Sequence, residues 1–264
     1  MLTHCSTAPI APTRLVILGA NGFISRSIQA WGLSRKIEIL AIGSSEIDLR
    51  LPENAELIAR RLRDSDTVIM TSILTPDKGK GWETFTSNID MASTICKSIE
   101  RRGCRHFVYL SSDAIYAEDD HPLTEESNRS PRDFYGLAHV AREMMLDALL
   151  RQSGIPYCVI RPCAIFGKGD SHNAYGPNRF VRSAIRERRI RLFGGGEEMR
   201  CHLYIDDLIN LIGLVVQHRS HGVINAAGDS VMSFYDLAVR IRELIDSRIA
   251  IECVARAPNK IGRA

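Results

Sequence analysis

The sequence lacks long apolar runs and a large excess of charge of either sign. No apolar stretch approaches the roughly 18 residues that a membrane-spanning helix needs, and residues 1–14 carry no secretory signal. With 34 basic and 31 acidic residues, the net charge is only +3, which does not by itself indicate a nucleic-acid partner. We therefore expect neither a membrane nor a nucleic acid among the partners.

The cysteines lack any recognisable pattern. There are seven, an odd number, and none forms a CxxC pair or a zinc-type spacing with histidine, so we expect no metal site. Most lie within apolar runs, where a thiol behaves as a small hydrophobic group. This usage favours reduced cysteines and a cytoplasmic protein.

Short apolar runs alternate with helical patterns through the first 160 residues. This alternation predicts βαβ units, and hence an α/β fold with a doubly wound parallel sheet covered by helices on both faces. The expected strands are 14–18, 37–42, 67–71, 105–111 and 157–161, and the expected helices lie near 23–33, 53–64, 83–102 and 134–153.

The rhythm of the sequence changes after Pro162. Residues 163–204 are richer in glycine, asparagine and arginine, with GKGDSHNAYGPNR as a loop, and helical patterns return at 206–217 and 233–246 around a short strand near 223–225. We expect a loose tail over 1–13, a dinucleotide-binding domain over 14–162, and a smaller substrate lobe over 163–264 that is interwoven with it.

A glycine-rich turn, Gly19-Ala20-Asn21-Gly22, follows the first long apolar run and precedes a helix. In this position backbone N–H groups and the helix N-terminus can meet a pyrophosphate. Gly19 permits the tight turn and Gly22 permits close approach of the ligand. The alternative is a glycine turn that binds no ligand.

The segment GANGFIS resembles the GxxGxxG loop of the extended short-chain dehydrogenase/reductases, the NAD-dependent epimerase/dehydratase family. Ser25 stands at the third glycine. Further matches follow in order over roughly residues 14–245: EIDL (46–49), SNI (87–89), YLSSDAIY (109–116), PLTE (122–125), YGLAH (135–139), RP (161–162), RCHLYIDD (200–207) and NAAG (225–228). The resemblance implies a Rossmann fold that binds NAD or NADP and modifies nucleotide-linked sugars.

The resemblance also implies which residues contact the cofactor: Gly19, Asn21, Gly22, Phe23, Ile24, Asp48, Leu49, Thr71, Ser72, Tyr135, His139 and Pro162. NAD binders usually end the second strand with an acid that holds the ribose 2′-hydroxyl. Here Gly43, Ser44 and Ser45 follow that strand, without an acid and without an arginine beside them for a 2′-phosphate. The choice between NAD and NADP stays open, with a slight preference for NADP.

The resemblance assigns catalysis to Tyr135 as acid/base, to Ser112 as the group that orients the reacting oxygen, and to His139 where the family has lysine. A tyrosine titrates near ~10 and needs a nearby positive charge to act as a base at neutral pH. Histidine is shorter than lysine and mostly neutral at pH 7. Two alternatives follow: an active epimerase or reductase in which another Arg or Lys compensates, and a catalytically impaired cofactor-binding protein of the same fold.

Ser112, Asp113, Arg179 and Arg200 are the expected substrate contacts, with Arg200 at the family's diphosphate-binding arginine. Asp113 matches the general acid of sugar 4,6-dehydratases, but Ala114 replaces the glutamate that follows it, which disfavours a dehydratase. The other arginines between 182 and 191 are expected to form a solvated helix face. They have no aromatic platform beside them, which disfavours RNA binding.

Two departures leave the substrate open: Ala164 and Cys201 replace an asparagine and an aspartate of the family's pattern. From the family's usual extent we would expect about 40 further residues. We also expect a homodimer through the helices at 83–102 and 134–153, on the basis of their apolar residues Ile89, Met91, Ile95, Met144, Met145 and Leu149.

Overall fold

The computed structural model describes residues 2–117, 122–170 and 176–255. These form two compact units: Met1–Pro162 together with Asp206–Ala226, and Cys163–Ile205 together with Ala227–Ala264. The helix and strand that follow residue 205, which we expected within the substrate lobe, therefore pack with the first unit. None of the helices in the described ranges has both the length and the apolar character to cross a membrane.

The first unit is built on a seven-stranded sheet, which confirms the doubly wound fold. All neighbouring strands run parallel except β1, and the residues of β2, β4 and β5 are all buried, as expected for strands covered on both faces. The strand order is β1 (Thr3–His4), β10 (Ser220–Ala226), β6 (Tyr157–Pro162), β5 (His106–Leu110), β4 (Thr67–Met70), β2 (Arg14–Leu18) and β3 (Glu38–Ile42).

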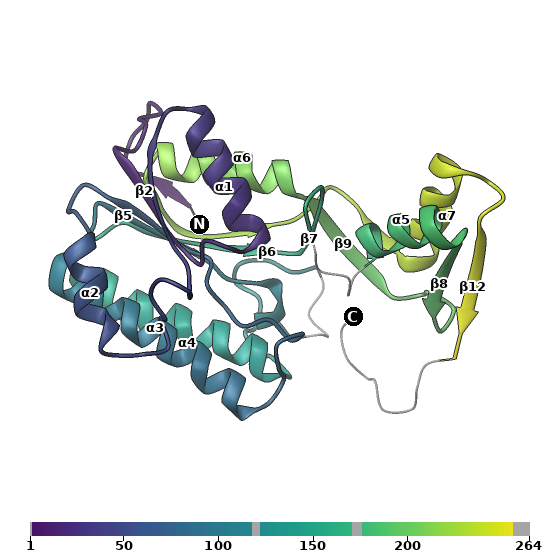
Figure 1. Cartoon of the computed structure of the whole chain (residues 1–264), viewed down its shortest axis with the longest axis horizontal. Coiled ribbons are helices and arrows are strands. Elements are labelled where there is room, and N and C mark those ends of the chain that lie inside the picture. Colours follow the sequence, from purple (N-terminus) through teal and green to yellow (C-terminus); the bar gives the residue numbers. More distant parts are fainter. Residues whose placement is uncertain (1, 118–121, 171–175, 256–264) are drawn as a thin grey trace. The chain divides into compact units, whose positions relative to one another are not determined.

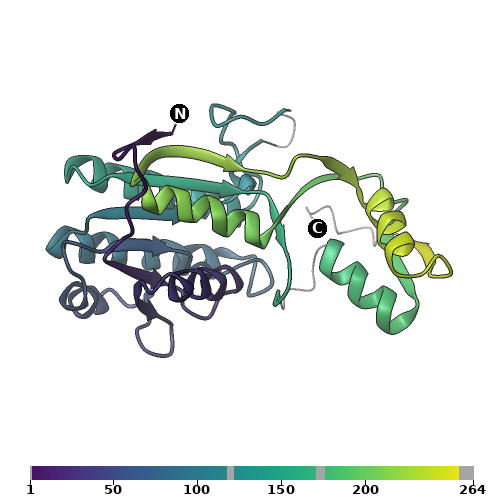
Figure 2. The ribbon, with the colours of Figure 1, turned by 90° about the horizontal axis from the view of Figure 1, so that it is seen from above.

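Helices cover both faces of this sheet (Figures 1 and 2). On one face lie α1 (Phe23–Ser34) and α6 (Ile205–Gln217), and on the other lie α2 (Asn54–Arg61), α3 (Trp82–Arg102) and α4 (Phe134–Gln152). Helix α6 approaches α1 closely because Gly213 has no side chain: a Cβ there would lie 2.7 Å from the Trp31 ring. The three-layer arrangement positions the carboxyl ends of the strands along one edge of the sheet.

The N-terminal segment differs from the loose tail expected from the sequence. Thr3 and His4 form β1, which pairs with the outer side of β10. The backbone N–H groups of Ser6 and Ile10 then donate to the carbonyls of His218 and Gln217. Without this segment, β10 would be an edge strand with unpaired backbone groups, and the pairing supplies their partners.

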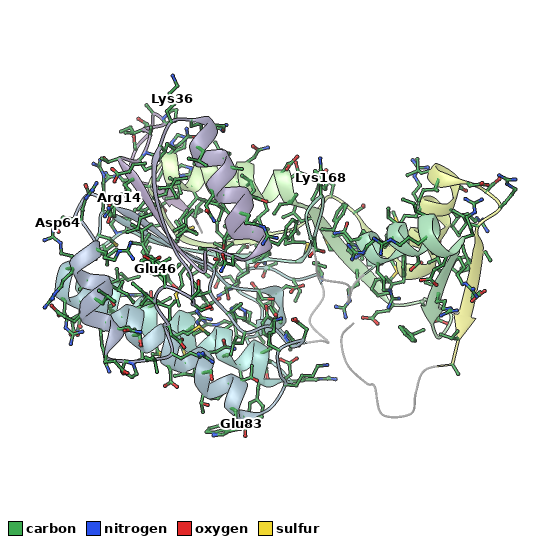
Figure 3. All side chains as sticks on the ribbon, in the orientation of Figure 1. Arg14, Lys36, Glu46, Asp64, Glu83 and Lys168 are labelled. Atoms are coloured by element: carbon green, nitrogen blue, oxygen red, sulfur yellow. The ribbon has the colours of Figure 1, made fainter. Side chains whose placement is uncertain are left out.

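A buried ion pair closes the amino end of the central strands. Arg14 on β2 donates from Nε and Nη2 to the Asp66 carboxylate at 2.8 and 2.6 Å, and both side chains are almost fully buried. By contrast, Lys36, Asp64 and Glu83 are exposed at the periphery of this unit (Figure 3). The amino end of the central strands is therefore closed by this ion pair and has a structural role.

The opposite end holds the topological switch point of the sheet. Strand β2 lies between β3 and β4, so the chain crosses to the other side of β2 after β3. In open α/β sheets the ligand binds outside the carboxyl ends of the strands at such a point. The loops after β2 and β4, which contain Gly19–Gly22 and Thr71–Ser72, flank it.

The second unit has its own small core, which includes Phe180, Ile190, Leu192 and Ile241. Its strands form a three-stranded sheet of β11 (Val231–Ser233), β9 (Met199–Tyr204) and β7 (Ala164–Phe166), and a pair of β12 (Ala250–Val254) with β8 (Arg189–Phe193); its helices are α5 (Gly176–Glu187) and α7 (Phe234–Ile245).

Much of residues 163–204, where the sequence predicted only the GKGDSHNAYGPNR loop, is therefore regular structure. Part of the GKGDSHNAYGPNR loop, residues 171–175, lies outside the described residues, and Gly176 already begins α5. The interpretation of the arginine stretch as one helix face is wrong beyond residue 187. Arg189 and Arg191 lie on β8 and pair with Glu252 of the neighbouring β12.

Candidate active site

The glycine loop is held against the end of β3 and opens α1. The N–H groups of Gly19 and Ala20 donate to the Ile42 carbonyl at 2.9 and 3.1 Å, and Gly22 is the N-cap of α1. No side chain caps this helix, so the first backbone N–H groups of α1 have no side-chain acceptor. This is the arrangement that a helix N-terminus offers to a phosphate.

Gly19 is required by the fold itself. Its φ is +105°, and a Cβ there would lie 2.9 Å from the Ser72 backbone and the Thr71 hydroxyl. Ser25, at the family's third glycine, is fully buried, and its Oγ lies 2.7 Å from the Gly19 carbonyl and 2.6 Å from Thr71 Oγ1. The serine thus links the glycine loop to the end of β4.

The segment after β3 contains the two residues expected near the adenine. The Asp48 carboxylate accepts hydrogen bonds from Arg50 at 2.6 to 3.1 Å, and this contact lowers the pKa of Asp48 below its usual range. The Leu49 side chain packs in the main hydrophobic core. A contact of either residue with a nucleotide stays a prediction.

Helix α4 begins beside the short 3₁₀ turn η1 (Asp113–Ile115), which follows β5. The two elements approach closely because Gly136 lacks a side chain: a Cβ there would lie 2.2 Å from the Ala114 carbonyl oxygen. Asp133 caps α4 by accepting from the Gly136 N–H at 2.8 Å. This packing brings the elements that carry Ser112 and Tyr135 together at the carboxyl end of β5.

The Ser112 hydroxyl has two hydrogen-bond contacts in this arrangement. Its Oγ accepts from the Ala114 N–H at 3.1 Å and donates to Asp113 Oδ1 at 3.2 Å. The hydroxyl therefore caps η1, and its catalytic role stays a prediction.

Tyr135 and His139 lie one turn apart on the same side of α4, as their spacing requires. The two rings meet edge to face with centroids 4.7 Å apart, and His139 is 1% exposed. His139 Nδ1 lies 2.7 Å from the Tyr109 hydroxyl, while Nε2 has no partner among the described residues. Burial, reinforced by Arg142, lowers the pKa of His139 well below its usual value, so the imidazole is neutral at pH 7.

Comparison with known proteins places these features in a family. The model of the NAD dependent epimerase/dehydratase family matches residues 15–227. This chain belongs to that family. Its members are described as NAD-dependent, and the match covers every element of the site just described.

Solved structures of epimerases and dehydratases share this fold. UDP-glucose 4-epimerase from Thermotoga maritima matches with a TM-score of 0.80 at 20% identity, over 94% of this chain and 86% of that chain. dTDP-glucose 4,6-dehydratase from Streptomyces venezuelae, solved with NAD bound, matches with a TM-score of 0.78 at 20% identity, over 92% and 85%.

Curated relatives are matched over shorter stretches. The dTDP-glucose 4,6-dehydratase of Escherichia coli is 25% identical over 173 residues, which are 58% of this chain and 45% of that protein. An uncharacterised UDP-glucose epimerase of Bacillus subtilis is 22% identical over 129 residues, or 49% and 40%. The chain thus spans about half the length of the curated relatives it matches.

Several family motifs meet in one partly buried hydrogen-bond network. The Tyr116 hydroxyl donates to Asn225 Oδ1 at 2.6 Å and accepts from Arg161 Nη1 at 2.8 Å, and the Asn225 N–H donates to Glu125 Oε1 at 2.7 Å. Arg161 and Glu143 form a two-point ion pair at 3.1 and 2.7 Å. These residues join the motifs after β5 to the ends of β6 and β10 and to α4, so their place in the family pattern has a structural reason.

The two candidate diphosphate arginines lie in the second unit. Arg200 on β9 pairs with Glu198, and its Nε is buried without a partner among the described residues. The Arg179 guanidinium lies over the Phe180 and Phe193 rings at 5.3 and 5.2 Å, and burial lowers its pKa. Cys201, which replaces the family's aspartate, exchanges hydrogen bonds with the backbone of Gly228.

Two site residues were missed from the sequence. Arg142 lies fully buried on α4, and Tyr109 on β5 lies between the Arg142 guanidinium and His139. Arg142 follows Tyr135 by seven residues, a helical spacing that could have revealed it. Tyr109 begins the YLSSDAIY motif, but nothing in the sequence indicated that its hydroxyl would meet His139.

The described residues fit a dinucleotide at this end of the sheet. Polar atoms of Ser72, Ser111, His139 and Arg142, all at the carboxyl ends of β4 and β5 or on the facing helix, are buried without partners among the described residues. Together with the uncapped start of α1, they give a polar ligand unsatisfied donors and acceptors beside the glycine loop.

Proposed function

We propose that this chain is an NAD-dependent epimerase or reductase of a nucleotide-linked sugar. The observation that carries the proposal is the meeting of Tyr135, His139 and the Ser112 turn at the carboxyl end of β5, beside the glycine loop at the switch point. The bound nicotinamide would supply the hydride acceptor and donor.

In this proposal each residue has a separate task. The glycine loop Gly19–Gly22 and the start of α1 hold the pyrophosphate through backbone N–H groups. The phenolic oxygen of Tyr135 exchanges a proton with the sugar hydroxyl or carbonyl, and the Ser112 hydroxyl turns from Asp113 to orient that oxygen. Arg200, whose Nε is buried without a partner among the described residues, and Arg179 stay predicted contacts of the substrate's diphosphate.

The proposal includes a choice between the two cofactors, NAD and NADP. Ser44 and Ser45 are exposed after β3, but the family description favours NAD, and we propose NAD over the NADP that the sequence slightly favoured. The cytoplasmic location stays a prediction.

One observation favours a second candidate, a cofactor-binding protein with impaired catalysis. The lysine position is occupied by His139, which is buried and neutral, so residue 139 supplies no positive charge to Tyr135. Such a protein would bind the dinucleotide but turn over no sugar.

The test is a panel of UDP- and dTDP-linked sugars incubated with NAD⁺, NADP⁺ and their reduced forms, with products followed by NMR and mass spectrometry. We expect conversion of at least one sugar, and loss of that conversion in Tyr135→Phe, which removes only the phenolic oxygen. Cofactor binding without conversion of any sugar favours the second candidate.

We also propose a homodimer through α3 and α4, on revised grounds. Met91 and Ile95 are buried in the core, and Met145 and Leu149 pack against it, so these four do not argue for a partner. Leu137 and Met144 on α4 are exposed, Met144 to 60%. Trp82 and Phe134 add a further exposed aromatic pair, with ring centroids 6.0 Å apart.

A further inference from the structure

Arg142 is the largest fully buried side chain in the described part of the protein. Its Nη2 donates to the Ser72 carbonyl at 2.6 Å. Its Nε and Nη1 have no hydrogen-bond partner among the described residues. A buried guanidinium normally uses most of its five donors, so this one is under-satisfied.

The charge of Arg142 also lacks a counter-ion. No carboxylate among the described residues lies within ion-pair distance of it, and the neighbouring Glu143 is committed to Arg161. Around the guanidinium lie the Tyr109 ring at 5.2 Å and the thiol of Cys96 on α3, whose pKa burial raises to about 11. Arginine cannot shed its proton, so a permanent charge is buried at considerable cost.

The guanidinium lies where that charge can act on the site. Helical side chains lean toward the helix N-terminus, so Arg142 covers the turn that carries His139, and its charge lowers the pKa of that imidazole further. Its carbonyl partner, Ser72, lies in the loop after β4, and the Ser72 backbone packs directly against Gly19 of the glycine loop. The charge therefore lies against Ser72, which contacts the glycine loop, and near His139, whose ring contacts Tyr135.

We propose that Arg142 supplies, from the next turn of α4, the positive charge that lysine supplies at position 139 in the resembled family. It acts through the Ser72 carbonyl, Tyr109 and His139, so it is a positioning residue that favours an anionic dinucleotide and an ionised Tyr135. The inference rests on the proposed function. A neutral residue 139 agrees with this arrangement, because a second cation there would be buried and would also face Arg142.

The first test compares Arg142→Met with Arg151→Met, which removes an exposed charge from the same helix. Calorimetric titration with NADH and NADPH should give a dissociation constant at least tenfold higher for Arg142→Met and within twofold of wild type for Arg151→Met. Equal affinity of folded Arg142→Met and wild type overturns the proposal.

The second test moves the charge back by one turn. The double variant His139→Lys/Arg142→Met should recover the affinity for NADH and NADPH to within about threefold of wild type, and turnover should regain the wild-type dependence on pH. If Arg142 were purely structural, a lysine at position 139 would restore neither. His139→Lys alone should bind no better than wild type and melt at a lower temperature, because two cations then share an apolar site. A double variant that binds no better than Arg142→Met contradicts the proposal.

A third measurement needs no cofactor, so it separates this proposal from the proposed function. Removing an uncompensated buried charge should leave the melting temperature of the ligand-free protein unchanged or higher. A fall of more than about 5 °C would assign Arg142 a structural role. If wild type binds neither nicotinamide cofactor, the proposed function fails, and the melting temperature still decides for or against the functional charge.

Discussion

Replacing Gly22 by valine tests the cofactor site with little disturbance of the fold. Gly22 has φ −68° and ψ 156°, an extended conformation that suits a β-branched residue. A Cβ there would lie 3.3 Å from Ser25 Oγ and 3.5 Å from the Gly19 carbonyl, which requires shifts of only a few tenths of an ångström. We expect a cost of about 1 kcal/mol, similar to the loss of a favourable N-cap residue.

That cost is small against a total stability of about 5–15 kcal/mol, so the variant should stay folded. The valine methyl groups, however, would occupy the start of α1 where the pyrophosphate must approach the backbone. We expect the affinity for NADH to fall at least a hundredfold, or about 2.7 kcal/mol, measured by calorimetric titration.

Gly19→Ala is the matched control, because there the fold itself requires glycine. With φ at +105° and backbone atoms 2.9 Å from the added Cβ, this variant should lose about 1–3 kcal/mol of stability in urea denaturation. Stability should therefore fall more in Gly19→Ala, and affinity should fall in Gly22→Val without a comparable loss of stability. A folded Gly22→Val protein that binds NADH and NADPH as tightly as wild type would refute the assignment of this loop to a dinucleotide.

Three further predictions concern stability and assembly. Burial lowers the pKa of His106 to about 4, so between pH 6.5 and 4 the unfolded chain binds more protons than the folded chain. Stability should therefore fall by about 1.4 kcal/mol per pH unit as the pH drops, which urea titrations at pH 7 and 5 measure. An unchanged dependence of stability on pH in His106→Gln would exclude His106 as the source. Glu143→Gln should cost about 3–5 kcal/mol because it leaves Arg161 buried and uncompensated, whereas adding Arg161→Met should recover part of that loss; additive costs would argue against the pair. Met144→Glu should convert the proposed dimer to a monomer in light scattering, and a wild-type mass near 29.5 kDa at micromolar concentration would count against the dimer itself.

The order of strands and helices in the first unit was predictable because each element carries its own pattern. Continuous apolar runs such as 67–71 favour strands buried on both faces, and a glycine-rich turn between a strand and a helix indicates a phosphate-binding loop. The family motifs could also be recognised in order from the sequence, and both the fold and the family were confirmed.

The roles of individual motif residues depended on contacts between distant segments. Tyr116, Arg161 and Asn225 lie far apart in the chain, and only the folded sheet brings them into one hydrogen-bond network. The N-terminal strand was missed for a similar reason, since two residues have no periodicity of their own and pair only because β10 leaves an edge open.

The protonation of His139 could be predicted only in part from the sequence. An isolated imidazole titrates near ~6.5, so His139 was expected to be mostly neutral at pH 7 and to supply less positive charge than lysine. Burial against Tyr109, reinforced by the charge of Arg142, lowers the pKa of His139 well below its usual value, and the buried cation of this helix is Arg142, one turn further along α4. Spacing determines which residues share a helix face, but burial and neighbouring charge set their ionisation, and these arise only when α4 packs on β5.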